Sequence, residues 1–280
     1  MASGEFLAFV DADDLWAPDK IEQQLRALEK GGPNAGFAYC WTATIDAAST
    51  VLTLDQRPSF EGQVLRGLCA HNFVGNGSSM LVRRSLFDAI GGFDTGLRAQ
   101  GAEGCEDYLF CLEAAERAQF RVVPRFLLGY RQLPTSMARN GPRMQRSLRI
   151  VLDRMRARHP EYRPETDRCF RGITWWLVRR ALRAGQVADA WHMTNELPSR
   201  DRRWLLQSMA AYLRTRVPGL PTRREPTVST PPHPPHFALL AEVEDHDTLP
   251  EDVSALAVRL PPSRTLPPSR PELRHELIDG

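Results

Sequence analysis

The sequence predicts an α/β domain that is followed by a helical extension and a proline-rich tail. In the first half of the chain, short apolar runs typical of buried strands alternate with segments of helical pattern. Arginine-rich helical patterns come next, and from Val217 prolines disfavour both helix and central strand. We therefore expect an α/β domain over residues 1–140, a helical extension over 141–216 and a proline-rich tail over 217–280, whose last 45 residues we expect to be disordered or loosely docked.

The apolar run "FLAFV" at residues 6–10 predicts the first strand, and its lack of polar residues indicates burial on both faces. The next segment, "APDKIEQQLRALEKGG", predicts a helix with Pro18 in its first turn and Gly31 at its end. The face of this helix that we expect to pack inward carries Ile21, Leu25 and Leu28.

The rest of the α/β domain follows the same alternation. "GFAYCW" at residues 36–41 predicts a second strand, and the polar residues 46–62 indicate a loop. "SSMLV" predicts a short strand, after which Ser85 is the expected N-cap of a short helix that ends at a glycine pair. A further helix is expected over 106–119 and a strand over 120–132.

The composition describes a globular chain with little net charge. Hydrophobic residues make up 42%, and a formal net charge of +2 is too small to indicate a nucleic-acid partner. No apolar run reaches the roughly 18 residues of a membrane-spanning helix, and the start "MASGEF" lacks a signal-peptide pattern. The five cysteines without CxxC spacing favour neither a disulfide framework nor a zinc site, so we expect a cytoplasmic location.

The carboxylates of Asp11, Asp13 and Asp14 directly follow the first predicted strand. Like charges at this distance raise one another's pKa, so a positive group is expected nearby. Ligand sites of open α/β sheets lie at the carboxyl ends of strands, and a carboxylate pair there suits Mg²⁺ or Mn²⁺. The pattern predicts a metal held by Asp11 and Asp13, although a strand-end turn with solvated carboxylates explains a bare D-x-D equally well.

Two other classes also place carboxylates in this way. A calcium loop of the EF-hand kind is disfavoured because Leu15 and Trp16 occupy the positions of a ligand and of the turn glycine. A phosphatase of the haloacid dehalogenase type also has D-x-D after an apolar strand. It has Thr or Val two residues beyond the second Asp, where this chain has Leu15, so it is a remote alternative.

Two longer motifs, in the right order, resemble family 2 glycosyltransferases with the GT-A fold. "GEFLAFVDADDLWAPDKIEQQ" resembles their central strand–DXD–Trp–x–Pro motif. "GNGSSMLVRRSLFDAIGGFD", the acidic "ED" that opens a helix and the later "YR" resemble their acceptor half. The resemblance covers roughly residues 3–140. It implies a partial GT-A domain with a Rossmann-like mixed sheet that transfers a sugar from a nucleotide-sugar donor to a hydroxyl of a glycan, lipid-linked or other acceptor.

The resemblance implies roles on the donor side of the site. Asp11 would lie by the ribose or the metal-bound diphosphate of the donor, and Asp13 would bind Mn²⁺ or Mg²⁺. Arg131 stands beside the segment that often covers the donor diphosphate in this family, so it is a candidate donor-binding residue. Asp14 is the least certain of the carboxylates in function, because it could instead cap the turn before the Pro18 helix.

The resemblance also implies roles on the acceptor side. Asp107 matches the catalytic base, with Glu106 as its acidic neighbour. A simpler interpretation of this pair is charge that complements the dipole at a helix N-terminus. Asn76, Ser78 and Ser79 are candidate acceptor-binding residues, although the chemistry of a turn accounts for them as well.

Only ten residues precede Asp11, whereas the nucleotide-binding half of the family needs two to three β–α units, roughly 60–90 residues. We therefore expect the strands that bind the nucleotide base to be missing from this chain. Two hypotheses follow. The chain is a fragment of a glycosyltransferase, or it is a truncated non-catalytic module that binds an acceptor or a partner chain.

The helical extension is strongly basic. Between residues 139 and 183 there are thirteen arginines and four acidic residues. One interpretation is a solvated helix face. The other is peripheral contact with an anionic membrane at its inner face, for which neighbouring aromatic and cationic side chains are suited. The residues that suggest this contact are Trp175, Trp176, Arg179 and Arg180.

Overall fold

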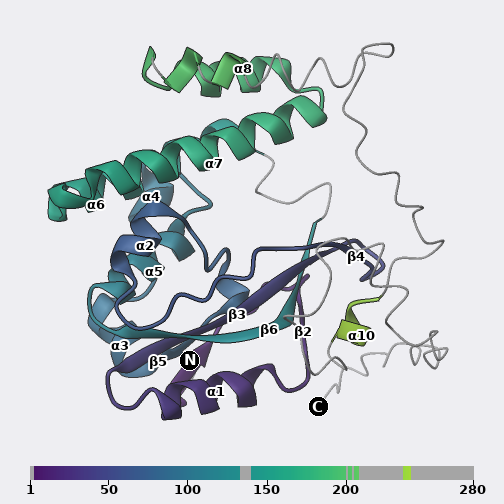
Figure 1. Cartoon of the computed structure of the whole chain (residues 1–280), viewed down its shortest axis with the longest axis vertical. Coiled ribbons are helices and arrows are strands. Elements are labelled where there is room, and N and C mark those ends of the chain that lie inside the picture. The colour runs from purple at the N-terminus through teal and green to yellow at the C-terminus, as the bar shows by residue number, and fades with distance from the viewer. Residues whose placement is uncertain (1–2, 133–139, 200, 204, 208–235, 241–280) are drawn as a thin grey trace, which may run out of the picture.

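The computed structural model describes residues 3–132, 140–199, 201–203, 205–207 and 236–240 (Figure 1). These residues form a curled mixed sheet with helices on both faces, followed by a further layer of helices. The α/β class with a mixed sheet and a helical region after it is therefore confirmed.

Within the described residues the sheet has the strand order β1-β5-β3-β6-β2, and β4 also pairs with β3. The central strands β3 and β6 run parallel, and every other pair is antiparallel. The strands are β1 (Phe6–Ala8), β2 (Leu15–Trp16), β3 (Ala35–Ile45), β4 (Val51–Leu54), β5 (Leu81–Arg83) and β6 (Gln119–Arg131).

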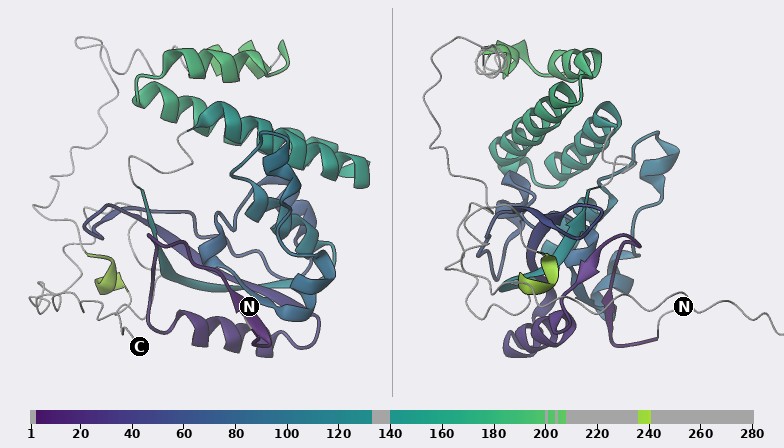
Figure 2. Two further views of the ribbon diagram at one scale, coloured as in Figure 1. Left: turned by 180° about the vertical axis from the view of Figure 1, so that it is seen from behind. Right: turned by 90° about the vertical axis from the view of Figure 1, so that its right-hand side faces the viewer.

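The helices divide between the two faces of the sheet (Figures 1 and 2). Helix α1 packs on one face, whereas α2, α3 and α5 pack around the largest apolar cluster on the other face. The helical elements of this domain are α1 (Lys20–Lys30), α2 (Leu65–Ala70), the 3₁₀ turn η1 (Gly77–Ser79), α3 (Arg84–Ile90), α4 (Gly96–Ala99) and α5 (Glu106–Ala115).

Strand β1 differs from its prediction. It is only three residues long, it pairs on one side with β5 among the described residues, and Val10 beyond it is 54% exposed. The expectation of a strand buried on both faces is therefore wrong. An apolar run shows which residues prefer a sheet, but its position at an edge depends on which strands lie next to it.

Strands β3 and β6 form the buried centre of the sheet. Every residue of β3 is buried, and the rings of Phe37 and Phe120 stack with their centres 4.0 Å apart. Both predicted strands are confirmed, and β3 extends beyond residue 41 because residues 42–45 pair with the end of β6. The predicted loop over 46–62 is wrong in part, since β4 lies within it and pairs with β3.

The helices on either side of the sheet show two further differences. In α1 the buried residues are Lys20, Gln24 and Leu28, so two polar side chains occupy a face that was expected to be apolar. Helix α3 begins without a side-chain cap, and the prediction of Ser85 as its N-cap is wrong. Gly91 ends α3 with φ of +90°, a conformation that glycine adopts without strain.

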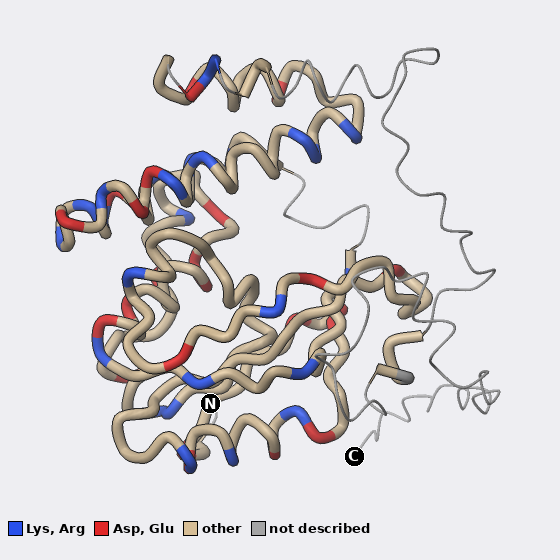
Figure 3. Tube along the Cα trace, viewed as in Figure 1, with Lys and Arg blue, Asp and Glu red and all other residues tan. Residues whose placement is uncertain are grey.

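The extension consists of α6 (Gly141–Arg158), η3 (Pro160–Tyr162), α7 (Arg163–Arg183) and α8 (Val187–Asn195). It packs through α7 on α2 and through α6 on α5. Charged residues of both signs recur along α6 and α7 (Figure 3). No helix in the described part of the chain is long and apolar enough to span a membrane.

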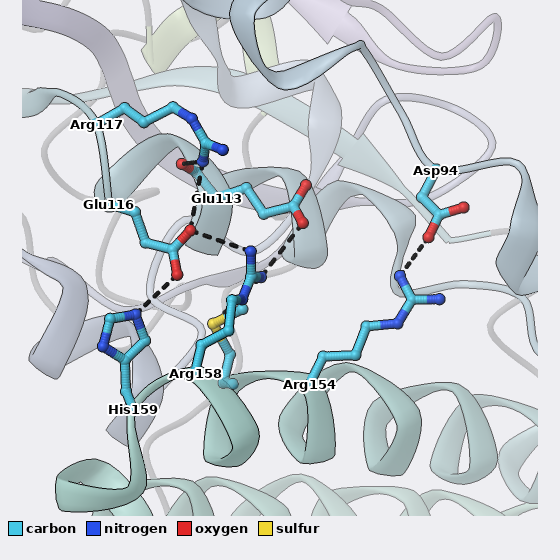
Figure 4. Close-up of polar contacts among 8 residues, drawn as sticks. Asp94, Glu113, Glu116, Arg117, Arg154, Arg158 and His159 are labelled. Carbon is cyan, nitrogen blue, oxygen red and sulfur yellow. Dashed lines mark hydrogen bonds and ion pairs between the residues drawn. The ribbon is translucent and has the colours of Figure 1, made fainter.

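Ion pairs fix the extension to the α/β domain (Figure 4). His159 Nε2 lies 2.7 Å from a carboxylate oxygen of Glu116, and Arg158 Nη1 lies 3.2 Å from the other oxygen. Arg154 pairs with Asp94, and this contact lowers the pKa of the Asp94 carboxyl. Several arginines of the extension are therefore neutralised by the domain beneath them.

The last described segment lies at the start of the 45 residues that were expected to be disordered or loosely docked. Helix α10 (Phe237–Leu240) docks on the sheet, where Phe237 and Leu240 are 3% and 0% exposed. The amide of Phe237 donates to the carbonyl of Ser49 at 2.8 Å. A Cβ at Gly129 would lie 3.1 Å from the Phe237 ring, so a larger residue there would disturb this contact. Most of the predicted tail lies outside the described residues.

Candidate active site

The acidic turn after β1, residues 11–14, is held from two sides. Its own backbone closes through a hydrogen bond from the Asp14 amide to the Asp11 carbonyl at 3.1 Å. Ser78 in η1 holds its start, because the Ser78 hydroxyl accepts from the Asp11 amide at 3.0 Å. Trp16 Nε1 donates to the Ser78 carbonyl at 3.0 Å, which ties β2 to the same point.

Arg131 at the end of β6 holds the other side of the acidic turn. Its Nε donates to the Asp13 carbonyl at 2.7 Å, and its backbone amide donates to the Asp14 carboxylate at 3.0 Å. The remaining guanidinium nitrogens donate to the Asp46 carbonyl and, at 2.9 Å, to the Ser49 hydroxyl. In this arrangement Arg131 positions the turn, and its predicted contact with the donor diphosphate stays a prediction.

The predicted acceptor residues lie in η1 and have structural partners. Ser78 and Ser79 are 1% and 0% exposed. The Ser79 hydroxyl donates to the carbonyls of Val74 and Asn76, at 3.2 and 2.9 Å, and the Asn76 side chain accepts from the Ser79 amide at 3.1 Å. The structure thus differs from the expectation that the two serines line an acceptor pocket. Ser78 ties η1 to the acidic turn, Ser79 closes η1 itself, and of the three residues only Asn76 is partly accessible.

Glu106 and Asp107 open helix α5 next to η1. Glu106 accepts from the Gly104 amide at 2.7 Å, and Asp107 accepts from the Tyr108 amide at 2.7 Å. A Cβ built at Gly77 would lie 3.9 Å from the Cβ of Asp107, which places the two segments in contact. Both carboxylates therefore bond amides at the helix start, as the dipole interpretation expects, but they also face the acidic turn.

The electrostatics of Asp107 suit a general base. Its carboxyl is surrounded by protein atoms on most sides, although part of the residue still meets solvent. Burial, together with repulsion from Glu106 and Asp11, raises the pKa of Asp107 to about 7, although the hydrogen bond from the Tyr108 amide acts in the opposite sense. A base with this pKa accepts protons effectively near neutral pH.

Asp11 and Asp13 carry charge that the fold does not compensate. Partial burial raises the pKa of Asp11, and repulsion from Asp13 and Glu106 adds to this increase. Within the described residues, neither the Asp11 nor the Asp13 carboxylate forms a hydrogen bond or an ion pair. Asp14 Oδ2 is buried without a hydrogen-bond partner in the same part of the chain. The carboxylate oxygens of Asp11 and Asp13 are therefore available to a cation, whereas those of Asp14 are buried.

A divalent metal fits these residues in one particular way. The described residues contain no group of three or more metal-binding side chains that would hold an ion alone. Mg²⁺ in enzymes is commonly held by one or two carboxylates together with substrate phosphates and water. Asp11 and Asp13 would supply such a pair, and hard oxygen ligands suit Mg²⁺ or Mn²⁺.

Two residues at the site were not predicted from the sequence. The first is half-buried Tyr130, and burial is the main cause that raises the pKa of its hydroxyl. The nearby charges of the acidic turn and of Asp107 raise this pKa further, while the second residue, Arg180 of α7, lowers it. The "YR" pair at the end of the last strand, directly before Arg131, was the available signal. The sequence indicated Arg180 only as a membrane-contact residue, because its closeness to Tyr130 depends on how the extension packs.

A buried lysine supports the site from beneath. Lys20 is 1% exposed, its ammonium lies 4.2 Å from the centre of the Trp16 ring, and burial lowers its pKa to about 8. Its Nζ donates to Gln24 at 2.8 Å, and Gln24 donates to the Ser79 carbonyl at 2.7 Å. This chain of contacts links α1 to η1 and thus to the acidic turn.

Fold and site together define an α/β enzyme domain with a candidate general base beside a metal-competent carboxylate pair. The profile of the family described as "Glycosyltransferase like family 2" matches residues 1–152. This chain therefore belongs to that family. The family assignment leaves the haloacid dehalogenase alternative without support.

Curated relatives agree with this assignment. The chain is 31% identical over 121 residues to an uncharacterized glycosyltransferase of Haemophilus influenzae, covering 42% of this chain and 38% of the relative. It is 33% identical over 98 residues to an uncharacterized glycosyltransferase of Rickettsia typhi, covering 34% and 31%. An uncharacterized protein of Sinorhizobium fredii is 26% identical over 141 residues, which cover 49% of this chain and 14% of that protein. The chain spans well under half of each relative.

Proposed function

We propose that this domain transfers a sugar from a nucleotide-sugar donor to an acceptor hydroxyl, with Asp107 as the general base. The observation that carries the proposal is the position of Asp107. It has a pKa raised to about 7 and lies in electrostatic contact with Asp11, the first carboxylate of the acidic turn. A proton acceptor and a cation site thus adjoin each other, as attack on a diphosphate-activated sugar requires.

The reaction follows from this arrangement. Asp107 takes the proton of the acceptor hydroxyl while the hydroxyl oxygen forms a bond to the anomeric carbon of the sugar. The bond from that carbon to the donor phosphate breaks, and its electron pair leaves with the nucleoside diphosphate. Glu106 holds the Gly104 amide and keeps the α5 start in place. Bound Mg²⁺ or Mn²⁺, held by Asp11 and Asp13, would supply positive charge to the diphosphate.

Asp107→Asn tests this proposal. We expect donor binding to be retained and transfer to fall by about 10²–10⁴-fold, the usual contribution of general-base catalysis. The measurement is release of nucleoside diphosphate from UDP-, GDP- and dTDP-sugars with glycan and lipid-linked acceptors. Asp88→Asn, a change of an exposed carboxylate on α3, is the matched control. Unchanged turnover in Asp107→Asn would show that another residue is the general base, and Glu106 would be the next candidate.

The same assay separates the proposal from the alternative of a non-catalytic module. Titration with UDP, GDP and dTDP in the presence of Mn²⁺ measures donor recognition without any chemistry. If the unmodified protein binds an acceptor or a partner chain but neither binds nucleotide nor shows turnover, the result favours a non-catalytic module. Turnover that depends on Asp107 supports the enzyme.

A location at the inner face of the membrane is also part of the proposal. Among the described residues of the extension, three large apolar side chains are exposed, which favours contact with a lipid surface. They are Trp176, Val187 and Trp191, exposed by 47%, 63% and 54%. The guanidinium of Arg180 stacks 5.3 Å from the centre of the Trp176 ring, so aromatic and cationic groups adjoin there.

A further inference from the structure

A cavity of about 640 Å³ lies in the helical extension, and none of the residues of the candidate active site line it. Arg143, Arg146 and Arg149 of α6 face this cavity, together with His192 and Glu196 at the end of α8. The three arginines are three residues apart, so successive helical turns present them to the same space. The volume is in the range of small-molecule sites in proteins.

The charges of the cavity do not balance. Arg143 pairs with Glu103 at 2.8 Å, and Arg149 pairs with Glu196 at 3.0 Å. Arg146 is exposed and has neither a hydrogen bond nor an ion pair within the described residues. The cavity therefore has a surplus guanidinium, with a histidine opposite and a single carboxylate in its lining.

The walls of the cavity are fixed by buried contacts. Gln145 is 2% exposed, and its amide nitrogen donates to the Thr174 hydroxyl at 3.2 Å and to the Met193 carbonyl at 2.9 Å. This single side chain joins α6, α7 and α8. The Arg146 Nη1 atom lies 3.8 Å from the position that a Cβ at Gly101 would take, so it reaches the loop before α5. The arginines are thus presented on a rigid scaffold.

We propose that this cavity binds a phosphate group, with Arg146 as its principal ligand. The planar guanidinium matches two phosphate oxygens, and flanking arginines increase the local positive potential. The phosphate could belong to a small soluble molecule or to a lipid, because exposed Trp191 directly precedes His192 on α8. The proposal rests on these residues alone and does not depend on sugar transfer.

Three variants test the phosphate site by calorimetry with inorganic pyrophosphate. Arg146→Gln removes the unpaired guanidinium and should weaken binding by about tenfold or more, the usual value of a charge-assisted hydrogen bond. Arg26→Gln removes one exposed arginine from α1 and is the matched control, expected to bind like the unmodified protein. Glu196→Gln removes the cavity carboxylate and should strengthen binding.

A second arm distinguishes the source of the phosphate. Vesicles of phosphatidylcholine with or without phosphatidic acid are co-sedimented with the same variants. The site is supported if Arg146→Gln weakens binding of pyrophosphate or of phosphatidic acid vesicles and Arg26→Gln does not. Binding to pyrophosphate indicates a soluble phosphate as the source, and binding to the vesicles indicates a lipid. Absence of binding in both arms, or equal binding by Arg146→Gln and Arg26→Gln, overturns the proposal.

Discussion

The acidic turn and the arginine-rich extension are both rich in charged side chains, but the charges of the turn lack ionic partners whereas several charges of the extension are paired. Asp11 and Asp13 have no ionic partner within the described residues, and partial burial together with their repulsion raises the pKa of Asp11. In the extension, Arg154 and Arg158 are paired with carboxylates of the domain beneath. Charge that the fold neutralises holds layers together, whereas charge that it leaves uncompensated indicates a ligand site.

The largest expected effect removes the uncompensated charge. Asp13→Ala should abolish Mn²⁺-dependent binding of a nucleoside diphosphate. Loss of a residue that only hydrogen-bonds to a metal ligand already lowers metal affinity by about 10–100-fold, and loss of a direct ligand should cost more. Titration calorimetry with UDP and GDP, with and without Mn²⁺, measures the change. Asp88→Ala is the control. Equal Mn²⁺ dependence in Asp13→Ala and the unmodified protein would show that the carboxylate pair is not the metal site.

The second expected effect concerns the stability that the fold gives up at Asp107. The folded pKa of about 7 is above the ordinary value of 3.8, so the folded protein loses stability as the pH rises from about 4 to about 7. One pKa unit corresponds to about 1.4 kcal/mol, so ionised Asp107 costs on the order of 2–4 kcal/mol at pH 8.

Asp107→Asn should therefore unfold at higher denaturant concentration than the unmodified protein at pH 8, because asparagine keeps an acceptor for the Tyr108 amide. The two proteins should converge at pH 4. Urea unfolding in the presence of a chelator measures both, since a bound cation would offset the repulsion. A stability difference that is constant with pH would contradict the raised pKa.

The smallest expected effect weakens the compensated region. Glu116→Gln removes a carboxylate whose side chain is 14% exposed and which pairs with Arg158 and His159. We expect a loss of about 1–2 kcal/mol, more than a surface pair contributes. Arg26→Gln, which breaks the exposed pair with Glu22, should change stability by less than about 0.5 kcal/mol. Urea unfolding measures the loss of stability in both variants. Equal losses would show that the contacts of Glu116 contribute no more than an exposed surface ion pair.

The parts of the site that lie within short motifs could be predicted from the sequence. A carboxylate pair after an apolar strand and an acidic pair at a helix start are local patterns, and the structure brings Asp11 and Asp107 into one electrostatic environment. The pattern of apolar residues likewise predicted strands β3 and β6 and helix α5. These features depend on neighbouring residues, so a sequence reading can reach them.

Features that depend on distant partners could not be predicted. The hydrogen bond from Asp11 to Ser78 joins residues 67 apart, and that from Arg131 to Asp13 joins residues 118 apart. Because of these contacts, Ser78 and Arg131, which were both expected to bind ligands, hold the acidic turn. Burial of Lys20 and docking of Phe237 also depend on surfaces that form only when the sheet is complete.

The parallel pairing of β3 with β6 has a consequence for the order of folding. It brings Ala35 next to Gln119, so a long intervening segment must be synthesised and ordered before the central ladder closes. The clamp on the acidic turn comes from Arg131, at the far end of that ladder. On the ribosome the aspartates emerge first and their clamp emerges last. A nascent chain that ends between Asp107 and Arg131 carries every carboxylate of the site without the geometry that makes them a site.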